Sequence, residues 1–247
     1  MSYIVAENLL KKYGSGDAAV SAIRDISFEI DAGEFVGIMG ESGAGKSTLL
    51  SIMGAMNAPT LGNYIVDDIN VYDLKSEQRA DFRREFLGFV FQSFHLVPYL
   101  TVLENVMLPL ATTKLAGKKK RSMAQEALAC VKLSDKGNRL PNQISGGEKE
   151  RVAIARAIVN DPPVLLADEP TGNLDTKTSA EIMELLLRLN SDGATIIMVT
   201  HSPQCAQYAR RILKVADGHL FDENQGIAQV ACVPEVQVSS PMLAHGV

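Results

Sequence analysis

The chain has 247 residues, of which 46% are hydrophobic, and a formal net charge of −5. This length suits one large α/β domain or two modest ones, and the apolar content is ample for a buried core. The negative charge excludes an electrostatic nucleic-acid footprint, so we expect no nucleic-acid partner. We expect the short basic run at residues 118–121, which has no interleaved aromatics, to be a solvated loop.

The cysteines and the N-terminus indicate the cellular compartment in which we expect the protein. Three cysteines, Cys130, Cys205 and Cys232, are far apart and match no metal-binding spacing, which favours a reduced cytosolic protein. The N-terminus lacks the charged start and apolar core of a targeting peptide. No apolar run approaches the roughly 20 residues that span a bilayer, so we expect any membrane role to come through a partner.

The chain begins with a predicted β region. Residues 3–9 and 22–30 are expected to form strands, the second of which alternates apolar and polar side chains. A polar turn that contains Tyr13 separates them. On its own, Tyr13 is an ordinary residue of an amphipathic turn.

The next stretch matches the phosphate-binding spacing G-x-x-x-x-G-K-[ST], which is a P-loop. A short apolar strand at residues 34–39 precedes it and a helix follows, as the motif requires. The glycines let backbone N–H groups converge on phosphate oxygens, and the helix N-terminus adds partial positive charge. We expect Lys46 to reach the β- and γ-phosphates and Ser47 to ligate Mg²⁺. The predicted phosphate-binding residues are Gly40, Glu41, Ser42, Gly43, Ala44, Gly45, Lys46, Ser47 and Thr48.

The region after the P-loop helix contains further elements. A strand pair is expected at residues 63–72, a polar helix at 76–86 and an apolar strand at 87–92 that ends in Gln92. From the sequence pattern alone, Gln92 is more simply a hydrogen-bonded structural residue than a ligand contact. An apolar loop follows, and residues 100–113 and 122–133 are expected to be helical. This stretch predicts a helical subdomain, about residues 93–160, inserted into the nucleotide domain.

A second glycine pair opens a predicted helix. Ser145, followed three residues later by Glu148, is a capping box, and apolar residues continue at helical spacing. Two glycines in a first helical turn, Gly146 and Gly147, cost helix propensity, about 1 kcal/mol each, which a purely structural helix has little reason to carry. They leave N–H groups bare for a phosphate, which suggests a nucleotide site assembled from two surfaces.

Two carboxylates follow a buried strand. The apolar run at residues 163–167 ends in Asp168 and Glu169, at the strand end where open α/β sheets bind ligands. We expect Asp168 to hold Mg²⁺ and Glu169 to polarise the attacking water, although Asp-Glu can also be a solvated strand end.

The rest of the chain completes the sheet. A helix at 176–190 and a buried strand at 195–200 lead to His201, which is either a loop residue or a donor to a terminal phosphate. A helix is expected at 204–210 and a last strand at 212–215. The cassette is expected to span residues 1–224, and residues 225–247 to form a flexible tail.

The order of the P-loop, Gln92, the Ser-Gly-Gly-Glu stretch, the acid pair and His201 resembles the ATP-binding cassette of ABC transporters. The resemblance covers nearly all of residues 1–222. It implies an α/β P-loop ATPase core with an N-terminal antiparallel β subdomain and an inserted helical subdomain, using ATP and Mg²⁺.

The resemblance also implies roles for individual residues. Tyr13 is similar to the aromatic that stacks on adenine, and Gln92 to the loop glutamine that meets Mg²⁺ and senses the membrane partner, which reverses its structural interpretation. Ser145 and Gly147 resemble the residues that contact the γ-phosphate held by a second subunit. Asp175 resembles the acid that links the two sites, and His201 the switch histidine.

Several phrases resemble the lipoprotein-release and macrolide-export group, which also contains cell-division ATPases. They lie at residues 91–96, 103–106 and 167–175. Two departures weaken this subgroup assignment. Lys149 and Glu150 stand where Gln-Gln or Arg-Gln is usual, and Ser202 stands where an acid often follows the histidine.

The resulting hypothesis is an ATPase subunit at the cytoplasmic face of the inner membrane. It dimerises head-to-tail around two Mg-ATP and drives export or release of a lipoprotein, lipid, drug or peptide through a permease contacted near the loop from Ser93 to Tyr99. The alternative is a signalling ATPase, as in cell division, that gates a partner without transport. Soluble cassettes of DNA repair or translation are disfavoured because no long coiled coil or second cassette is present, and one serving iron–sulphur assembly stays open.

Overall fold

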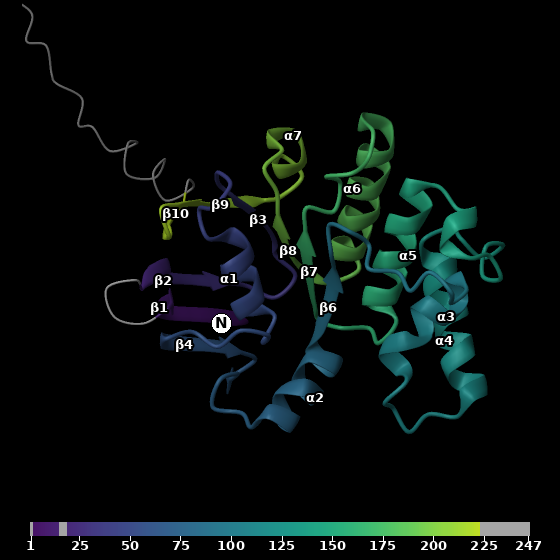
Figure 1. The fold of residues 1–247 in the computed structure, drawn as a ribbon, viewed down its shortest axis with the longest axis horizontal. Helices are drawn as coiled ribbons and strands as arrows, with labels where there is room; N and C mark the ends of the chain where they lie inside the picture. The colour runs from purple at the N-terminus through teal and green to yellow at the C-terminus, as the bar shows by residue number, and fades with distance from the viewer. Residues whose placement is uncertain (1, 15–18, 223–247) are drawn as a thin grey trace, which may run out of the picture.

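The computed structural model describes residues 2–14 and 19–222, and the predicted tail at 225–247 lies outside them. Two sheets form the frame (Figure 1): an antiparallel sheet on one side, a mostly parallel sheet through the middle, and a group of helices on the other side. The predicted α/β class with an N-terminal antiparallel sheet is confirmed. The division into domains at residues 93–160 and 225–247 stays a prediction.

The antiparallel sheet has the order β2-β1-β4-β5. Its strands are β1 (Ile4–Tyr13), β2 (Val20–Ile30), β4 (Leu61–Val66) and β5 (Ile69–Asn70). Strand β2 buries Ile23 and Ile26, which are three residues apart rather than two. Asp25 between them has a positive φ of 54°, and the register with β1 shifts there, so an irregularity in the pairing returns the apolar residues to one face.

The larger sheet has the order β10-β9-β3-β8-β7-β6 and is parallel except for β10. Its strands are β3 (Phe35–Met39), β6 (Leu87–Val90), β7 (Val164–Asp168), β8 (Thr195–Val199), β9 (Arg211–Ala216) and β10 (His219–Asp222). The prediction that β9 is the last strand is wrong. Asp217 and Gly218 adopt φ of 50° and 79°, which is the geometry of a two-residue hairpin, so the chain returns as β10.

The helices are α1 (Lys46–Met53), α2 (Ser76–Phe86), α3 (Val102–Met107), α4 (Gly117–Cys130), α5 (Gly146–Ile158), α6 (Thr176–Ser191) and α7 (Pro203–Ala206), with 3₁₀ turns at Leu108–Leu110 and Pro141–Gln143. No helix among the described residues is long and apolar enough to span a bilayer.

Two helix predictions need correction. Helix α4 begins five residues before the expected position 122, so the basic run at 118–121 is a helical turn and not a loop, because lysine and arginine are good helix formers. Helix α7 covers four residues instead of 204–210. The N–H of Arg210 already donates to the carbonyl of Phe35 (2.9 Å), which draws the chain into the sheet.

Alternate residues of the central strands point into two separate cores. In β7, Leu166 joins a core made with α1 and the antiparallel sheet, whereas Leu165 joins the core made with α3, α4, α5 and α6. Continuous apolar strands buried on both faces are typical of parallel sheets. Their carboxyl ends are thereby fixed at one edge, where the P-loop and the acid pair lie.

One buried acid stands out in the helical core. Glu150 of α5 is 1% exposed, and its Oε1 has no hydrogen-bond partner among the described residues. Burial raises its pKa from the ordinary 4.5 to about 8, and the positive charge of Arg156 opposes the shift. A raised folded pKa means that folding favours the neutral acid. The stability that this provides is fully present below the unfolded value of 4.5 and is lost as the pH rises through about 8.

We predict that Glu150→Gln changes how stability depends on pH. The neutral amide needs no proton. The unfolding free energy of the variant, relative to that of wild type, should therefore rise by about 2–4 kcal/mol from pH 5 to pH 9. Denaturant unfolding at pH 5, 7 and 9 measures this. Glu184→Gln, at an exposed position of α6, is the matched control, and its unfolding free energy should change with pH as that of wild type does. Parallel curves for Glu150→Gln would contradict the prediction.

Candidate functional site

The loop between β3 and α1 is fitted closely to the backbone on both sides. A Cβ at Gly40 would lie 2.1 Å from the carbonyl oxygen of Val215, and one at Gly45 would lie 2.4 Å from that of Ala22. Gly45 also has a φ of 108°. Gly43 differs, because it has a φ of 81° but no atom within 4 Å of its Cβ position. Two glycines are therefore required by packing, and Gly43 faces open space.

The start of α1 suits an anion. Its N-cap is Gly45, and no side chain caps the first turn. Lys46 is 9% exposed, and its Nζ donates to the carbonyl oxygens of Gly40 (2.7 Å) and Glu41 (2.8 Å). The lysine is thus folded back over the loop beside an uncapped helix N-terminus, where negative charge is stabilised.

A cavity of about 410 Å³ opens at this loop. Its lining brings together most of the predicted site, and it is formed by Ala22, Ser42, Gly43, Gly45, Lys46, Ser47, Thr48, Gln92, Asp168, Glu169, Val199 and His201. The other predicted loop residues, Gly40, Glu41 and Ala44, line a neighbouring hollow with Ser42, Gly43 and His201. Ala22 and Val199 were not predicted, since an apolar strand residue carries no sequence signal of its position in space.

The acid pair reaches the cavity because β7 ends there. The N–H of Glu169 donates to the carbonyl of Val199 (2.9 Å), which ties the end of β7 to the end of β8. Burial, and secondly the neighbouring charge of Glu169, raise the pKa of Asp168, while Lys46 lowers it. A cation bound between Asp168 and Glu169 would offset the cost of burying their negative charges, so the carboxylates favour a positively charged ligand.

Glu169 and His201 are in direct contact. Nδ1 of His201 lies 2.8 Å from Oε1 of Glu169, and the Glu169 side chain is 12% exposed whereas that of His201 is 68% exposed. Glu169 has a φ of 49°, which is uncommon for a non-glycine residue. Strained backbone of this kind is often found at functional sites.

Gln92 lies in the cavity at the start of a braced loop. Nδ2 of Asn173 donates to the Gln92 carbonyl oxygen (2.7 Å). Two nitrogens of Arg156 donate to the carbonyls of Phe94 and His95 (both 2.6 Å), which have φ of 58° and 47°. The guanidinium holds two consecutive left-handed residues in place.

The residues fit a magnesium–nucleotide complex. Among residues 2–14 and 19–222, no group of three or more His, Cys, Asp or Glu forms a cage for a metal. Ser47, Gln92 and Asp168 supply oxygen donors around one cavity. Mg²⁺ prefers oxygen ligands and is commonly held by one or two carboxylates together with substrate phosphates and water. The open position at Gly43 leaves room for those phosphates.

Tyr13 lies away from this cavity. It is 44% exposed, its hydroxyl accepts a hydrogen bond from Nδ2 of Asn57 (2.6 Å), and Nζ of Lys11 lies 5.2 Å from its ring centroid. Asn57 follows the carboxyl end of α1, so the ring is turned toward the end of the helix opposite the P-loop. Adenine stacking by Tyr13 stays a prediction.

The Ser-Gly-Gly-Glu stretch forms the predicted capping box outside the cavity. The Glu148 N–H donates to Oγ of Ser145 (3.2 Å), and the Ser145 N–H donates to Oε2 of Glu148 (2.8 Å). Asp175 caps α6 in the same way by accepting from the N–H of Thr178 (3.0 Å). The structure places Ser145 and Asp175 at neighbouring helix starts, and neither lines the phosphate cavity.

One step of the sequence argument needs correction. A Cβ at Gly147 would lie 2.4 Å from the Thr178 methyl carbon, so this glycine has a packing reason within the chain. At Gly146 the nearest contact would be Leu174 at 3.7 Å, which is an ordinary distance. The helix therefore has space for a side chain at 146, whereas one at 147 would require Thr178 to move.

Comparison with known proteins gives the family. The ABC transporter family model matches residues 23–172. An uncharacterized ABC transporter ATP-binding protein of Bacillus subtilis, YvrO, is 46% identical over 223 residues, which are 90% of this chain and 97% of the relative. The macrolide export ATP-binding/permease protein MacB of Syntrophobacter fumaroxidans is 42% identical over 98% of this chain, which spans 34% of that relative.

A solved structure is equally similar. The dimeric post-hydrolysis structure of the cassette MJ0796, bound to ADP and Pi, has a TM-score of 0.82 and 43% identity, over 89% of this chain and 97% of that one. MJ0796 comes from Methanocaldococcus jannaschii. The chain therefore belongs to the ABC transporter family and is one of its ATP-hydrolysing cassettes.

Proposed function

We propose that the chain is the nucleotide-binding subunit of a membrane transporter and that it works as a head-to-tail dimer around two Mg-ATP. One observation carries the proposal: the phosphate cavity holds Lys46, Asp168, Glu169 and His201, whereas Ser145 and Gly147 lie off it. One protomer thus carries both surfaces that its motifs describe, but they do not meet at one cavity. The dimeric structure of the related cassette MJ0796 supports closure by a second copy.

Each residue at the cavity has a role that its position supports. Lys46 and the bare start of α1 hold the β- and γ-phosphates and neutralise their charge. Mg²⁺, held by Ser47, Gln92 and Asp168, would supply further charge stabilisation. Glu169 orients the attacking water and accepts its proton, and His201, 2.8 Å away, fixes that carboxylate and donates toward the terminal phosphate.

The second surface is supplied by the partner copy in this proposal. Ser145 and the first N–H groups of α5 face the γ-phosphate of the other protomer, and Asp175 at the start of α6 meets the same interface. Tyr13 stacks on adenine after the side chain leaves Asn57. ATP then joins two incomplete surfaces, so its binding and hydrolysis close and open the dimer.

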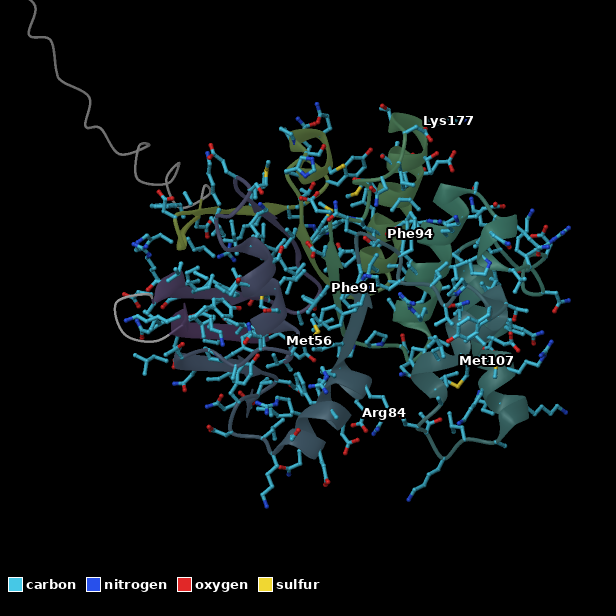
Figure 2. All side chains as sticks on the ribbon, in the orientation of Figure 1. Met56, Arg84, Phe91, Phe94, Met107 and Lys177 are labelled. Atoms are coloured by element: carbon cyan, nitrogen blue, oxygen red, sulfur yellow. The ribbon has the colours of Figure 1, made fainter. Side chains whose placement is uncertain are left out.

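The braced loop that follows Gln92 is the proposed contact with the permease. Phe89 and Phe91, which lead into it, are stacked with ring centroids 5.3 Å apart, and His95 in the loop is tilted against Phe91 at 4.9 Å. Figure 2 shows Phe91 between Met56 and Phe94 on one face of the molecule. Tyr99 in the same loop is 79% exposed. An exposed aromatic side chain such as Tyr99 on a fixed loop suits a protein partner.

We propose that the subunit lies at the cytoplasmic face of the inner membrane, bound through its permease. The MacB relatives carry a permease in their own names, and this chain spans about a third of their length. We propose the same class of partner, with export or release of a lipoprotein, lipid, drug or peptide as the work done.

We predict that Glu169→Gln keeps ATP binding and abolishes hydrolysis, because the amide cannot take a proton from water. The ATP-bound variant should accumulate as a dimer on size-exclusion chromatography, with turnover reduced by at least about 100-fold. Lys46→Ala is the comparison, since it should lose nucleotide binding and stay monomeric with ATP. A Glu169→Gln protein that remains monomeric or turns over normally would overturn the proposed mechanism.

We predict that Tyr99→Ser weakens capture of the membrane partner without lowering the thermal unfolding temperature, because the ring is exposed and its loss leaves no cavity. Loss of an aromatic anchor should reduce affinity by about tenfold or more. Co-purification with a co-expressed candidate permease measures it. Leu115→Ser, which removes an apolar side chain that is 41% exposed outside the loop, serves as the control. Equal capture by both variants would place the contact elsewhere.

A further inference from the structure

The first turns of α5 and α6 pack against each other at Gly147, which has no side chain. The methyl carbon of Thr178 lies 2.4 Å from the position that a Cβ would take at Gly147, a separation that real Cβ atoms do not show. A glycine inside a helix costs about 1 kcal/mol relative to alanine. The chain carries that cost at a point where α6 packs against α5, so this contact is part of the architecture of the site.

The Thr178 side chain is held by Asp175. Oδ2 of Asp175 accepts a hydrogen bond from the Thr178 hydroxyl (2.6 Å), while Oδ1 accepts one from its backbone N–H (3.0 Å). The hydroxyl and the methyl share one carbon, so fixing the hydroxyl also fixes the direction of the methyl. Asp175 thereby aims the methyl at Gly147.

Two neighbouring contacts add to the packing of α5 against α6. One turn further along both helices, Arg151 and Glu181 form an ion pair of 2.8 Å. On the other side, Leu174 lies against Gly146, at 3.7 Å from its Cβ position. The two helices lie side by side in Figure 1. The first turn of α5 therefore rests on the first turn of α6 and on the segment before it.

That segment begins at the acid pair. From Glu169 the chain runs through a turn in which the Gly172 N–H donates to the Glu169 carbonyl (3.0 Å). Asn173 then donates to the carbonyl of Gln92 (2.7 Å), and Asp175 caps α6. The seven residues 169–175 thus connect the proposed catalytic carboxylate of Glu169, the loop at Gln92 and the start of α6, on which α5 packs.

We infer that Thr178 is a positioning residue: its methyl, aimed by Asp175, sets the orientation of the Ser145–Gly147 surface relative to Glu169 in the same protomer. This rests on the proposed function, because that surface acts on the nucleotide of the second copy. A shift of the segment after Glu169 in one site then moves the surface that closes the other site. Thr178 is the contact through which this shift passes.

The test is a double-mutant cycle between positions 147 and 178. Thr178→Ser keeps the hydroxyl bond to Asp175 and removes the methyl, which makes room for a Cβ at 147. Gly147→Ala alone should lower both the thermal unfolding temperature of the nucleotide-free protein and kcat, and Gly147→Ala with Thr178→Ser should recover both. We expect coupling of about tenfold in kcat, which corresponds to about 1.4 kcal/mol. ATP affinity of the P-loop, measured with a fluorescent nucleotide, should stay unchanged.

Gly146→Ala is the matched control, because its Cβ has space and Thr178→Ser should not alter its effect. Thr178→Val keeps the methyl and loses the bond to Asp175, and it should lower kcat without a shift in nucleotide affinity. This variant also tests the inference if Gly147→Ala cannot be purified. Additive effects at 147 and 178, or coupling in unfolding temperature without coupling in kcat, would overturn the positioning role.

The unfolding measurement separates the inference from the proposed function. It is made without nucleotide, so it reports the packing of Gly147 on Thr178 even if the chain does not hydrolyse ATP. Absence of ATPase activity in wild type, with coupled unfolding temperatures, would refute the proposed function and leave the packing intact. Normal wild-type ATPase with uncoupled variants would refute the positioning role alone.

Discussion

The structure depends on close backbone contact around the phosphate loop. Gly40 approaches the carbonyl of Val215 in the larger sheet, and Gly45 approaches that of Ala22 in the antiparallel sheet. The N–H of Gly218 also donates to the carbonyl of Ala44 (3.1 Å). The loop is thus held between the two sheets, and any side chain at Gly40 or Gly45 would push them apart. Such a rigid seat keeps the uncapped start of α1 aimed at one point, as electrostatic stabilisation requires.

The parallel sheet then supplies the charges that the loop lacks. Its strands end at the same edge, so Asp168 and Glu169 at the end of β7 meet Lys46 and His201 from other strands and helices in one cavity. Two adjacent acids are costly when partly buried, as the raised pKa of Asp168 shows. The cost is tolerated because the same low-polarity surroundings strengthen the attraction of these acids for a bound cation.

The sequence predicted the local elements around this site well. The P-loop spacing, the capping box of Ser145 and the helix start at Asp175 all depend on neighbours within a few residues, and the structure places each element as expected. The contact between Glu169 and His201 was beyond reach, because 32 residues separate them and only sheet pairing unites them. The basic run at 118–121 was misjudged because charge alone does not distinguish a solvated loop from an exposed helical turn.

Gly147 shows where such reasoning stops and what the structure adds. A glycine at a helix start has two physical explanations, a bound anion or a close neighbour, and the sequence does not separate them. Gly146 and Gly147 look alike in the sequence, yet a side chain fits at the first position and collides with Thr178 at the second. Both explanations apply at Gly147, because the helix proposed to face a partner's phosphate also packs against Thr178. In the proposed dimer, a residue chosen for packing inside one protomer therefore sets the geometry of a surface that the other protomer uses.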